Sequence, residues 1–171
     1  MSELQLAMDA MARLAAPGPG HARLEPLLGA WQTTTSMWVD PARDPLQTHG
    51  SATRSWILGG RFLQEDLSGR GPDGTPYAGR LLTGFDNGAQ RYTGIWISDG
   101  ATSLSPFSGR FDDASQTFVF LGDEPDPTGA GPARAFRRTL QLQPEGQRLT
   151  QTYRLPDGAE LRAFAIDYRR A

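Results

Sequence analysis

Two acids and an arginine near a pair of glycines give this sequence its strongest candidate for chemistry. The stretch WILGGRFLQED, residues 56–66, places Glu65 and Asp66 shortly after Gly59-Gly60. If the glycines form a two-residue hairpin turn, direct strand pairing sets Arg54 opposite Glu65. Because side chains alternate along a strand, Asp66 then points to the opposite, more polar face. Glu65 and Arg54 are therefore predicted to form a cross-strand pair on the more apolar face.

This pair allows two kinds of chemistry. Burial raises the pKa of a carboxyl group, so Glu65 is the candidate acid/base catalyst of an isomerase, hydratase or cyclase. A neighbouring arginine has the opposite effect and keeps a carboxylate ionised. Beside Arg54, Glu65 is better suited to structure or to anchoring a ligand than to proton transfer.

Aromatic residues could complete a pocket around the pair. Together with Arg54 and Glu65, the candidate ligand-binding residues are Trp38, Trp56, Phe85, Tyr92 and Trp96. Apolar walls with a few polar groups are typical of small-molecule sites. The same aromatic side chains could instead simply fill a hydrophobic core.

The elements that position these residues are predicted to be β-strands. From Trp31 onward, about ten segments rich in Thr, Val, Trp, Tyr and Phe alternate with separators such as GPDG, DNGAQ, DDAS and PEGQ. These separators have the chemistry of tight turns, and no helical segment interrupts the strands. A mainly β, antiparallel up-and-down barrel is expected, since closure removes exposed strand edges. Four-residue loops would set Phe85 opposite Tyr92 and Phe111 opposite Phe118.

The N-terminal segment has a different pattern. Residues 1–20 are predicted to form a short helix followed by a Pro/Gly linker, and residues 21–171 form the barrel domain. Ser2 and Gln5 have the spacing of a capping box, and Leu4, Met8 and Met11 recur at helical spacing. This helix could pack on the barrel, on a second copy in a homodimer, or on another protein.

Composition excludes several functional classes. The chain has 171 residues, no cysteine and a net charge of −2, with 17 arginines spread among 19 acids. Disulfides, thiolate chemistry and iron–sulfur clusters are therefore absent, and no basic stripe for nucleic acid is expected. The N-terminus lacks the basic region of a signal peptide, and no apolar run is long enough for a membrane helix. We expect a cytoplasmic protein that binds neither nucleic acid nor membrane.

No catalytic or metal motif stands out. There is no Walker loop, dinucleotide fingerprint or nucleophile elbow, and the two histidines do not suggest a catalytic triad. Residues 122–129, GDEPDPTG, gather three acids that could hold a hard cation. Their spacing does not match an EF-hand, so we interpret the segment as a solvated turn and expect no metal.

Four stretches resemble a bacterial family catalogued as domain of unknown function 1579. They are HARLEPLLGAW, ATRSWILGGRFLQEDLSG, GRLLTGFDNGAQRYTGIWIS and DGAELRAFAIDYRR, and the resemblance extends from about His21 to Arg169. It implies a lipocalin-like, calycin-type barrel, with Gly29 and Trp31 similar to the Gly-x-Trp that opens the first lipocalin strand. The family carries no agreed activity.

Similarity to nitrobindin-type barrels raises the question of haem, which those proteins hold through a histidine near the chain end. The last strands here contain no histidine, because His21 and His49 lie earlier in the chain. No cofactor is expected. The leading hypothesis is a barrel that binds a small, partly apolar ligand, and the alternatives are an enzyme using Glu65 or a protein-interaction module.

Overall fold

The computed structural model describes residues 2–40, 42–126, 129–155 and 157–171. Three short helical elements precede the strands: α1 (Glu3–Ala15), α2 (Pro19–Ala22) and the 3-10 helix η1 (Glu25–Leu27). The strands are β1 (Gly29–Met37), β2 (Leu46–Ile57), β3 (Phe62–Arg70), β4 (Pro76–Asp86), β5 (Arg91–Ser98), β6 (Ser105–Asp112), β7 (Thr117–Glu124), β8 (Arg134–Gln143), β9 (Gly146–Arg154) and β10 (Glu160–Arg170).

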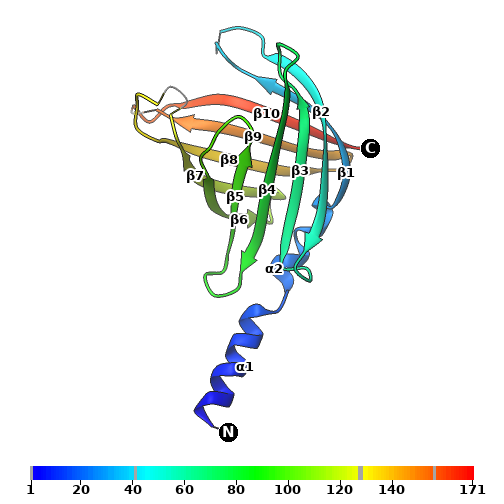
Figure 1. The fold of residues 1–171 in the computed structure, drawn as a ribbon, viewed down its shortest axis with the longest axis vertical. Helices are drawn as coiled ribbons and strands as arrows, with labels where there is room; N and C mark the ends of the chain where they lie inside the picture. The colour runs from blue at the N-terminus through cyan, green and yellow to red at the C-terminus, as the bar shows by residue number, and fades with distance from the viewer. Residues whose placement is uncertain (1, 41, 127–128, 156) are drawn as a thin grey trace.

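The ten strands form a closed antiparallel barrel in which each strand pairs with its sequence neighbours (Figure 1). β1 closes the barrel by pairing with β10, from Trp31 opposite Arg170 to Met37 opposite Phe164. Closure leaves no unpaired strand edge. The predicted mainly β, up-and-down barrel with a short N-terminal helix is confirmed.

The β2–β3 hairpin has the predicted register but a wider loop. Arg54 pairs with Glu65, and the last pair is Ile57 with Phe62, so the loop contains residues 58–61 rather than only the two glycines. Leu58 has a φ of 49°, and Gly59 and Gly60 have φ values of 66° and 82°. Glycine tolerates this left-handed backbone at no steric cost, which explains the double glycine. The predicted pairs Phe85–Tyr92 and Phe111–Phe118 are also present.

Because side chains alternate between the two faces of a strand, every second side chain points into the barrel. On β3, Leu63, Glu65 and Leu67 are buried, whereas Ser68 is exposed. A cluster of aromatic and leucine side chains fills much of the interior, and Phe118 is fully buried. The core is therefore the lumen of the barrel.

One end of the barrel is covered by α2 and η1, which bury His21, Leu24 and Leu27. The indole of Trp31 donates to the Leu27 carbonyl at 2.9 Å. This bond helps to fix the chain before β1 across the barrel end, which we call the floor. At the opposite end, which we call the mouth, β1, β3, β5, β7 and β9 end and β2, β4, β6, β8 and β10 begin.

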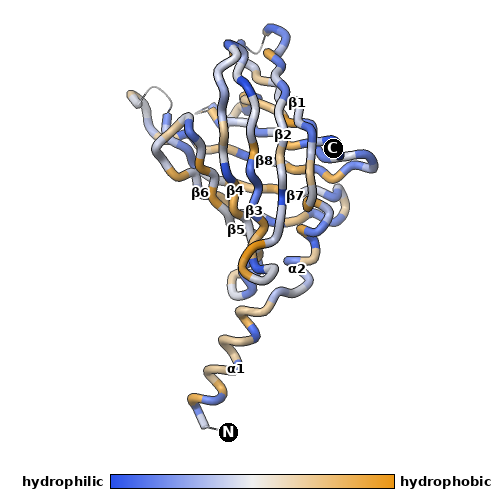
Figure 2. The backbone as a smooth tube through the Cα atoms, turned by 45° about the vertical axis from the view of Figure 1, so that its right-hand side comes forward, coloured by the Kyte–Doolittle hydropathy of each residue, from blue (hydrophilic) through white to orange (hydrophobic). Residues whose placement is uncertain are grey.

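Helix α1 projects away from the barrel in both views (Figures 1 and 2). The Ser2 hydroxyl accepts a hydrogen bond from the Gln5 amide at 3.2 Å and caps the helix N-terminus. At the other end, the Asn87 side chain donates to the carbonyls of Leu14 and Ala16 at 2.8 Å each. No residue of α1 is buried. The helix is thus tethered at its C-terminal end and unpacked along its length.

Candidate functional site

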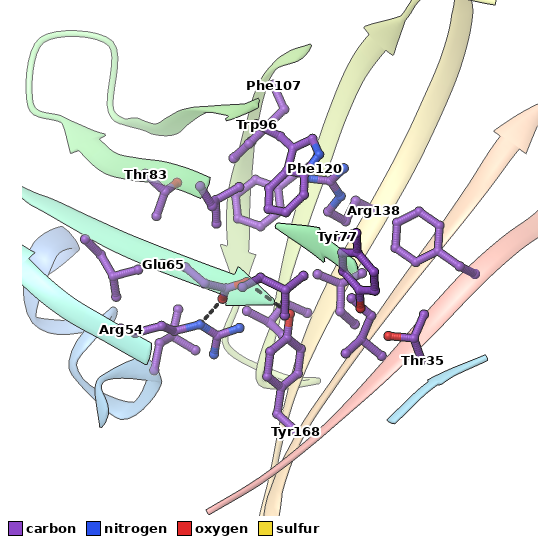
Figure 3. Close-up of a pocket in the computed structure, with 18 of the residues that line it drawn as sticks. Thr35, Arg54, Glu65, Tyr77, Thr83, Trp96, Phe107, Phe120, Arg138 and Tyr168 are labelled. Atoms are coloured by element: carbon purple, nitrogen blue, oxygen red, sulfur yellow. Dashed lines mark hydrogen bonds and ion pairs between the residues drawn. The ribbon is translucent and has the colours of Figure 1, made fainter. Parts of the chain in front are cut away.

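The barrel contains a cavity of about 410 Å³, which extends from the floor toward the mouth (Figure 3). This volume lies within the usual range for small-molecule pockets, roughly 300–1,000 Å³. Its walls are mainly apolar and include Leu63, Leu81, Phe107, Phe120 and Leu140. The interior strand positions are thus not completely filled by side chains. A few polar and charged groups interrupt the apolar walls.

The first polar group is the Arg54–Glu65 pair, which lies near the floor. The Arg54 Nε–H donates to Glu65 Oε2, and the Tyr168 hydroxyl donates to Glu65 Oε1 at 3.3 Å. Only 4% of Arg54 and 3% of Glu65 are exposed. The Arg54 guanidinium also lies 4.2 Å from the centre of the Tyr168 ring. Pairing with a carboxylate and an aromatic ring is what makes burial of these charges tolerable.

The contacts of Arg54 with Glu65 and Tyr168 keep its guanidinium protonated. Burial alone would lower the pKa of Arg54, but Glu65 and Tyr168 more than offset this and raise it above its usual value. Burial likewise raises the pKa of the Tyr168 phenol, with a further contribution from the Glu65 carboxylate. Arg54 is therefore a permanent cation, and Tyr168 stays a neutral donor.

A neighbouring amide joins the ion pair to the floor. Arg54 Nη1 donates to Gln147 Oε1, and Gln147 Nε2 donates to the Pro26 carbonyl at 2.9 Å. Arg170 also donates to the Pro26 carbonyl, at 3.2 Å. The Arg54 network therefore holds η1 in place, which is a structural role in addition to any contact with a ligand.

The second polar group is centred on Arg138 of β8. Its Nε and Nη2 both donate to Gln151 Oε1, at 2.9 Å and 2.6 Å. The guanidinium lies 4.9 Å from the ring centre of Phe136 and 5.4 Å from that of Phe107. Burial lowers the pKa of Arg138, although nearby Glu124 counteracts this. Among the residues that the structure describes, Arg138 forms no ion pair.

Glu124 lies at the mouth of the same cavity. It ends β7 and accepts hydrogen bonds from the Tyr153 hydroxyl and, at 3.3 Å, from Gln151 Nε2. Burial and this carboxylate raise the pKa of Tyr153 to about 12. The interpretation of residues 122–129 as a solvated turn is therefore wrong for Glu124, which belongs to a strand and lines the cavity. Residues 127 and 128 lie outside the described part of the chain.

The structure distributes the seven predicted ligand-binding residues over four places. Arg54, Glu65 and Trp96 line the cavity. The others are not among its lining residues: Phe85 and Tyr92 pack near the floor, Trp56 packs against the core, and Trp38 follows β1 under the Arg162 guanidinium. Whether any of them contacts a ligand stays a prediction.

Several lining residues went unnoticed at the level of sequence. Arg138 is an example, because in RAFRRTLQL it alternates with Phe136 and Leu140, the pattern of an arginine on an apolar face. Gln151 and Tyr153 do not line the cavity themselves, but they alternate in the same way on β9 and hydrogen-bond to Arg138 and Glu124. Period-two alternation was the available signal for all of them. Tyr168 is different, since only closure of the barrel by β10 against β1 brings it to Glu65.

An acid/base role for Glu65 stays a prediction. Both of its oxygens accept hydrogen bonds, one from Arg54 and one from Tyr168. Proton transfer to a substrate would require one of these bonds to break. The described residues contain no group of three or more acids or histidines arranged to hold a metal ion.

Comparison with models of protein families shows which family this chain belongs to. A family model described as a protein of unknown function, DUF1579, matches residues 16–170. The chain belongs to the DUF1579 family. The match covers the whole DUF1579 barrel and the linker before it, and it begins directly after the last residue of α1.

Two solved structures are similar to this DUF1579 protein. The crystal structure of Rv2717c from M. tuberculosis has a TM-score of 0.65 at 15% identity, covering 91% of this chain and 99% of that one. A fluorescence-activating β-barrel designed de novo has a TM-score of 0.42 at 14% identity, covering 84% of this chain and 93% of that one. The likeness to Rv2717c supports the fold alone. A comparison with curated proteins finds no match.

A search of the described residues for membrane-spanning helices finds none, since no helix there is both long and apolar enough.

Proposed function

We propose that this DUF1579 protein binds a small, partly apolar molecule inside its barrel. The cavity of about 410 Å³ carries the proposal, because it combines apolar walls with a few buried polar groups. A barrel of this size has room for its own side chains or for one small ligand. Here the side chains leave the central space between Leu63, Phe120 and Leu140 unfilled.

The arrangement supports binding better than catalysis. Arg54 and Glu65 neutralise each other, and Arg54 also holds the floor through Gln147 and Pro26. A group that maintains the fold in this way is suited to offer a fixed polar surface to a ligand. A cytoplasmic location remains part of the same proposal.

Titration with the neutral apolar dye Nile red tests this function. Dye fluorescence should increase and saturate with the barrel, and Trp96 emission should be quenched because Trp96 lines the cavity. A matched pair of variants localises the site. Leu81 lines the cavity, whereas the adjacent Leu82 lies on the other face of β4.

The variant Leu81→Trp should abolish dye binding by filling the cavity, and Leu82→Trp should leave it intact. Circular dichroism would confirm that both variants are folded. Native mass spectrometry of the purified protein adds a search for a natural ligand. Absence of dye binding by the native barrel, together with no bound mass, would rule the proposal out.

A second candidate function, assembly, is favoured by the exposure of α1. Leu4, Met8 and Met11 are 70%, 56% and 70% exposed, and they recur on one stripe of the helix. We propose a second copy of this chain as the partner. Glu3 and Arg13 lie at opposite ends of α1, so an antiparallel pair of helices would bring opposite charges together.

Light scattering tests this assembly. The full chain should have the mass of a dimer, and the double variant Met8→Glu/Met11→Glu should be monomeric because the stripe becomes charged. Deletion of residues 1–16 should have the same effect. A monomeric full chain, or an unchanged mass after both alterations, would count against a role for α1.

A further inference from the structure

The two buried arginines of the cavity differ in how their charge is balanced. Arg54 has a carboxylate partner, Glu65. Arg138 is only 7% exposed, and its sole hydrogen-bond acceptor among the described residues is the neutral amide oxygen of Gln151. A buried cation without an anionic partner is costly, so its presence needs a reason.

The free edge of Arg138 is geometrically suited to an anion. Gln151 occupies the Nε–Nη2 edge of the guanidinium, and no acceptor among the described residues contacts Nη1. The Nη1–Nη2 edge can therefore donate two parallel hydrogen bonds to a carboxylate. The rings of Phe107 and Phe136 pack against the guanidinium and limit its movement. Arg138 lines the cavity beside Phe120, its cross-strand partner (Figure 3).

Glu124 does not already fill this role. Its oxygens accept from Tyr153 and from Gln151 Nε2, so Gln151 bridges Arg138 and Glu124 and keeps them apart. Glu124 also lines the cavity and would repel an anion placed near it. An anionic group would therefore contact Arg138 on the side away from Gln151.

We propose that the cavity selects an amphipathic monoanion, whose carboxylate or similar oxyanion pairs with the free edge of Arg138. The apolar body of this ligand lies among lining residues such as Leu81, Leu140 and Leu149. This inference rests on the proposed ligand-binding function and adds the charge of the ligand.

Binding of three ten-carbon compounds tests the proposal. Decanoate, decanol and decylamine share one apolar body and differ in charge. Their affinities for the native barrel can be measured by calorimetry and by displacement of Nile red. Because charge-assisted hydrogen bonds are about twice as strong as neutral ones, decanoate should bind at least about tenfold more tightly than decanol. Decylamine should bind most weakly.

Variants at two adjacent positions test whether Arg138 causes the preference for decanoate. Arg138→Gln should remove the preference for decanoate, because decanoate loses far more affinity than decanol when the cation is absent. Arg137→Gln is the matched control, because Arg137 is exposed on the opposite face of β8, and it should preserve the preference.

The outcomes separate the two proposals. If the native barrel binds Nile red but binds decanol with the same affinity as decanoate, the charge assignment is wrong and the cavity function stands. Retention of the decanoate preference in a folded Arg138→Gln variant would also overturn the assignment. If none of the compounds binds, the ligand-binding function itself fails. Should Arg138→Gln not fold, the three-compound series on the native protein still decides the question.

Discussion

Replacing Glu65 by glutamine should strongly destabilise the barrel, and the structure indicates by how much. The change keeps the shape of the side chain but removes the charge that balances Arg54, of which only 4% is exposed. Removing one partner of a buried ion pair costs about 3–5 kcal/mol. Glutamine can still accept from Arg54 Nε, so we expect the lower end, about 3 kcal/mol. For a chain of this length that corresponds to about 6–12 °C in Tm.

Asp66 provides a matched control on the next residue of β3. It pairs with Arg80 at 2.7 Å on the outer surface, where the two side chains are 46% and 52% exposed. An exposed pair contributes about 0–1 kcal/mol, so Asp66→Asn should have little effect. Each variant removes one carboxylate charge that pairs with an arginine, at a buried position for Glu65 and at an exposed one for Asp66.

Urea unfolding followed by circular dichroism measures both free energies. A double variant, Arg54→Met/Glu65→Leu, should recover only part of the loss, because apolar replacement of a buried pair is often neutral but here leaves the Gln147 oxygen without its donor. Equal effects of Glu65→Gln and Asp66→Asn would refute the reasoning that burial makes the pair important.

Three further predictions concern the floor, the packing and the mouth. Burial and the charge of Arg61 lower the pKa of His21, so the folded protein favours the neutral imidazole ring. The free energy of unfolding should therefore decrease as pH falls below 6.5, where the unfolded chain binds the proton more readily. This decrease, measured by urea unfolding, should be smaller in His21→Gln. A methyl group at Gly109 would overlap the Val119 carbonyl, so Gly109→Ala should cost about 1–3 kcal/mol in urea unfolding, whereas Gly18→Ala, which faces open space, should not. The pKa of Tyr153 is raised from 10.0 to about 12, so the free energy of unfolding should fall as pH rises from 10 to 12, with a shallower fall in Tyr153→Phe.

Local patterns in the sequence predicted much of the fold. The turn between β2 and β3 set Arg54 opposite Glu65, and the DNGAQ and DDAS turns set Phe85 opposite Tyr92 and Phe111 opposite Phe118. These are short-range features, because a hairpin loop determines the register of the strands it joins. The length of the first loop was less predictable, since Leu58 adopts a positive φ that a leucine does not favour.

The aromatic candidates show where sequence reasoning reached its limit. Alternation indicates that Phe85, Tyr92 and Trp96 point inward, but not at which height of the barrel each side chain meets the others. The structure places Trp96 on the cavity and Phe85 and Tyr92 near the floor, beside the buried His21. Height depends on the strand stagger of the closed barrel, which no single hairpin specifies.

By itself the sequence determined the ten-stranded meander, the face on which each residue lies and the Arg54–Glu65 pair, because turns and period-two alternation act over a few residues. The tertiary structure alone decided that Tyr168 meets Glu65, that Gln147 reaches Pro26 and that Arg138 shares a cavity with Glu65 and Tyr168. These contacts join segments more than 100 residues apart, and they exist only once β1 pairs with β10. The cavity volume also depends on closure, since it equals the volume of the closed lumen minus the volume of the side chains that point into it.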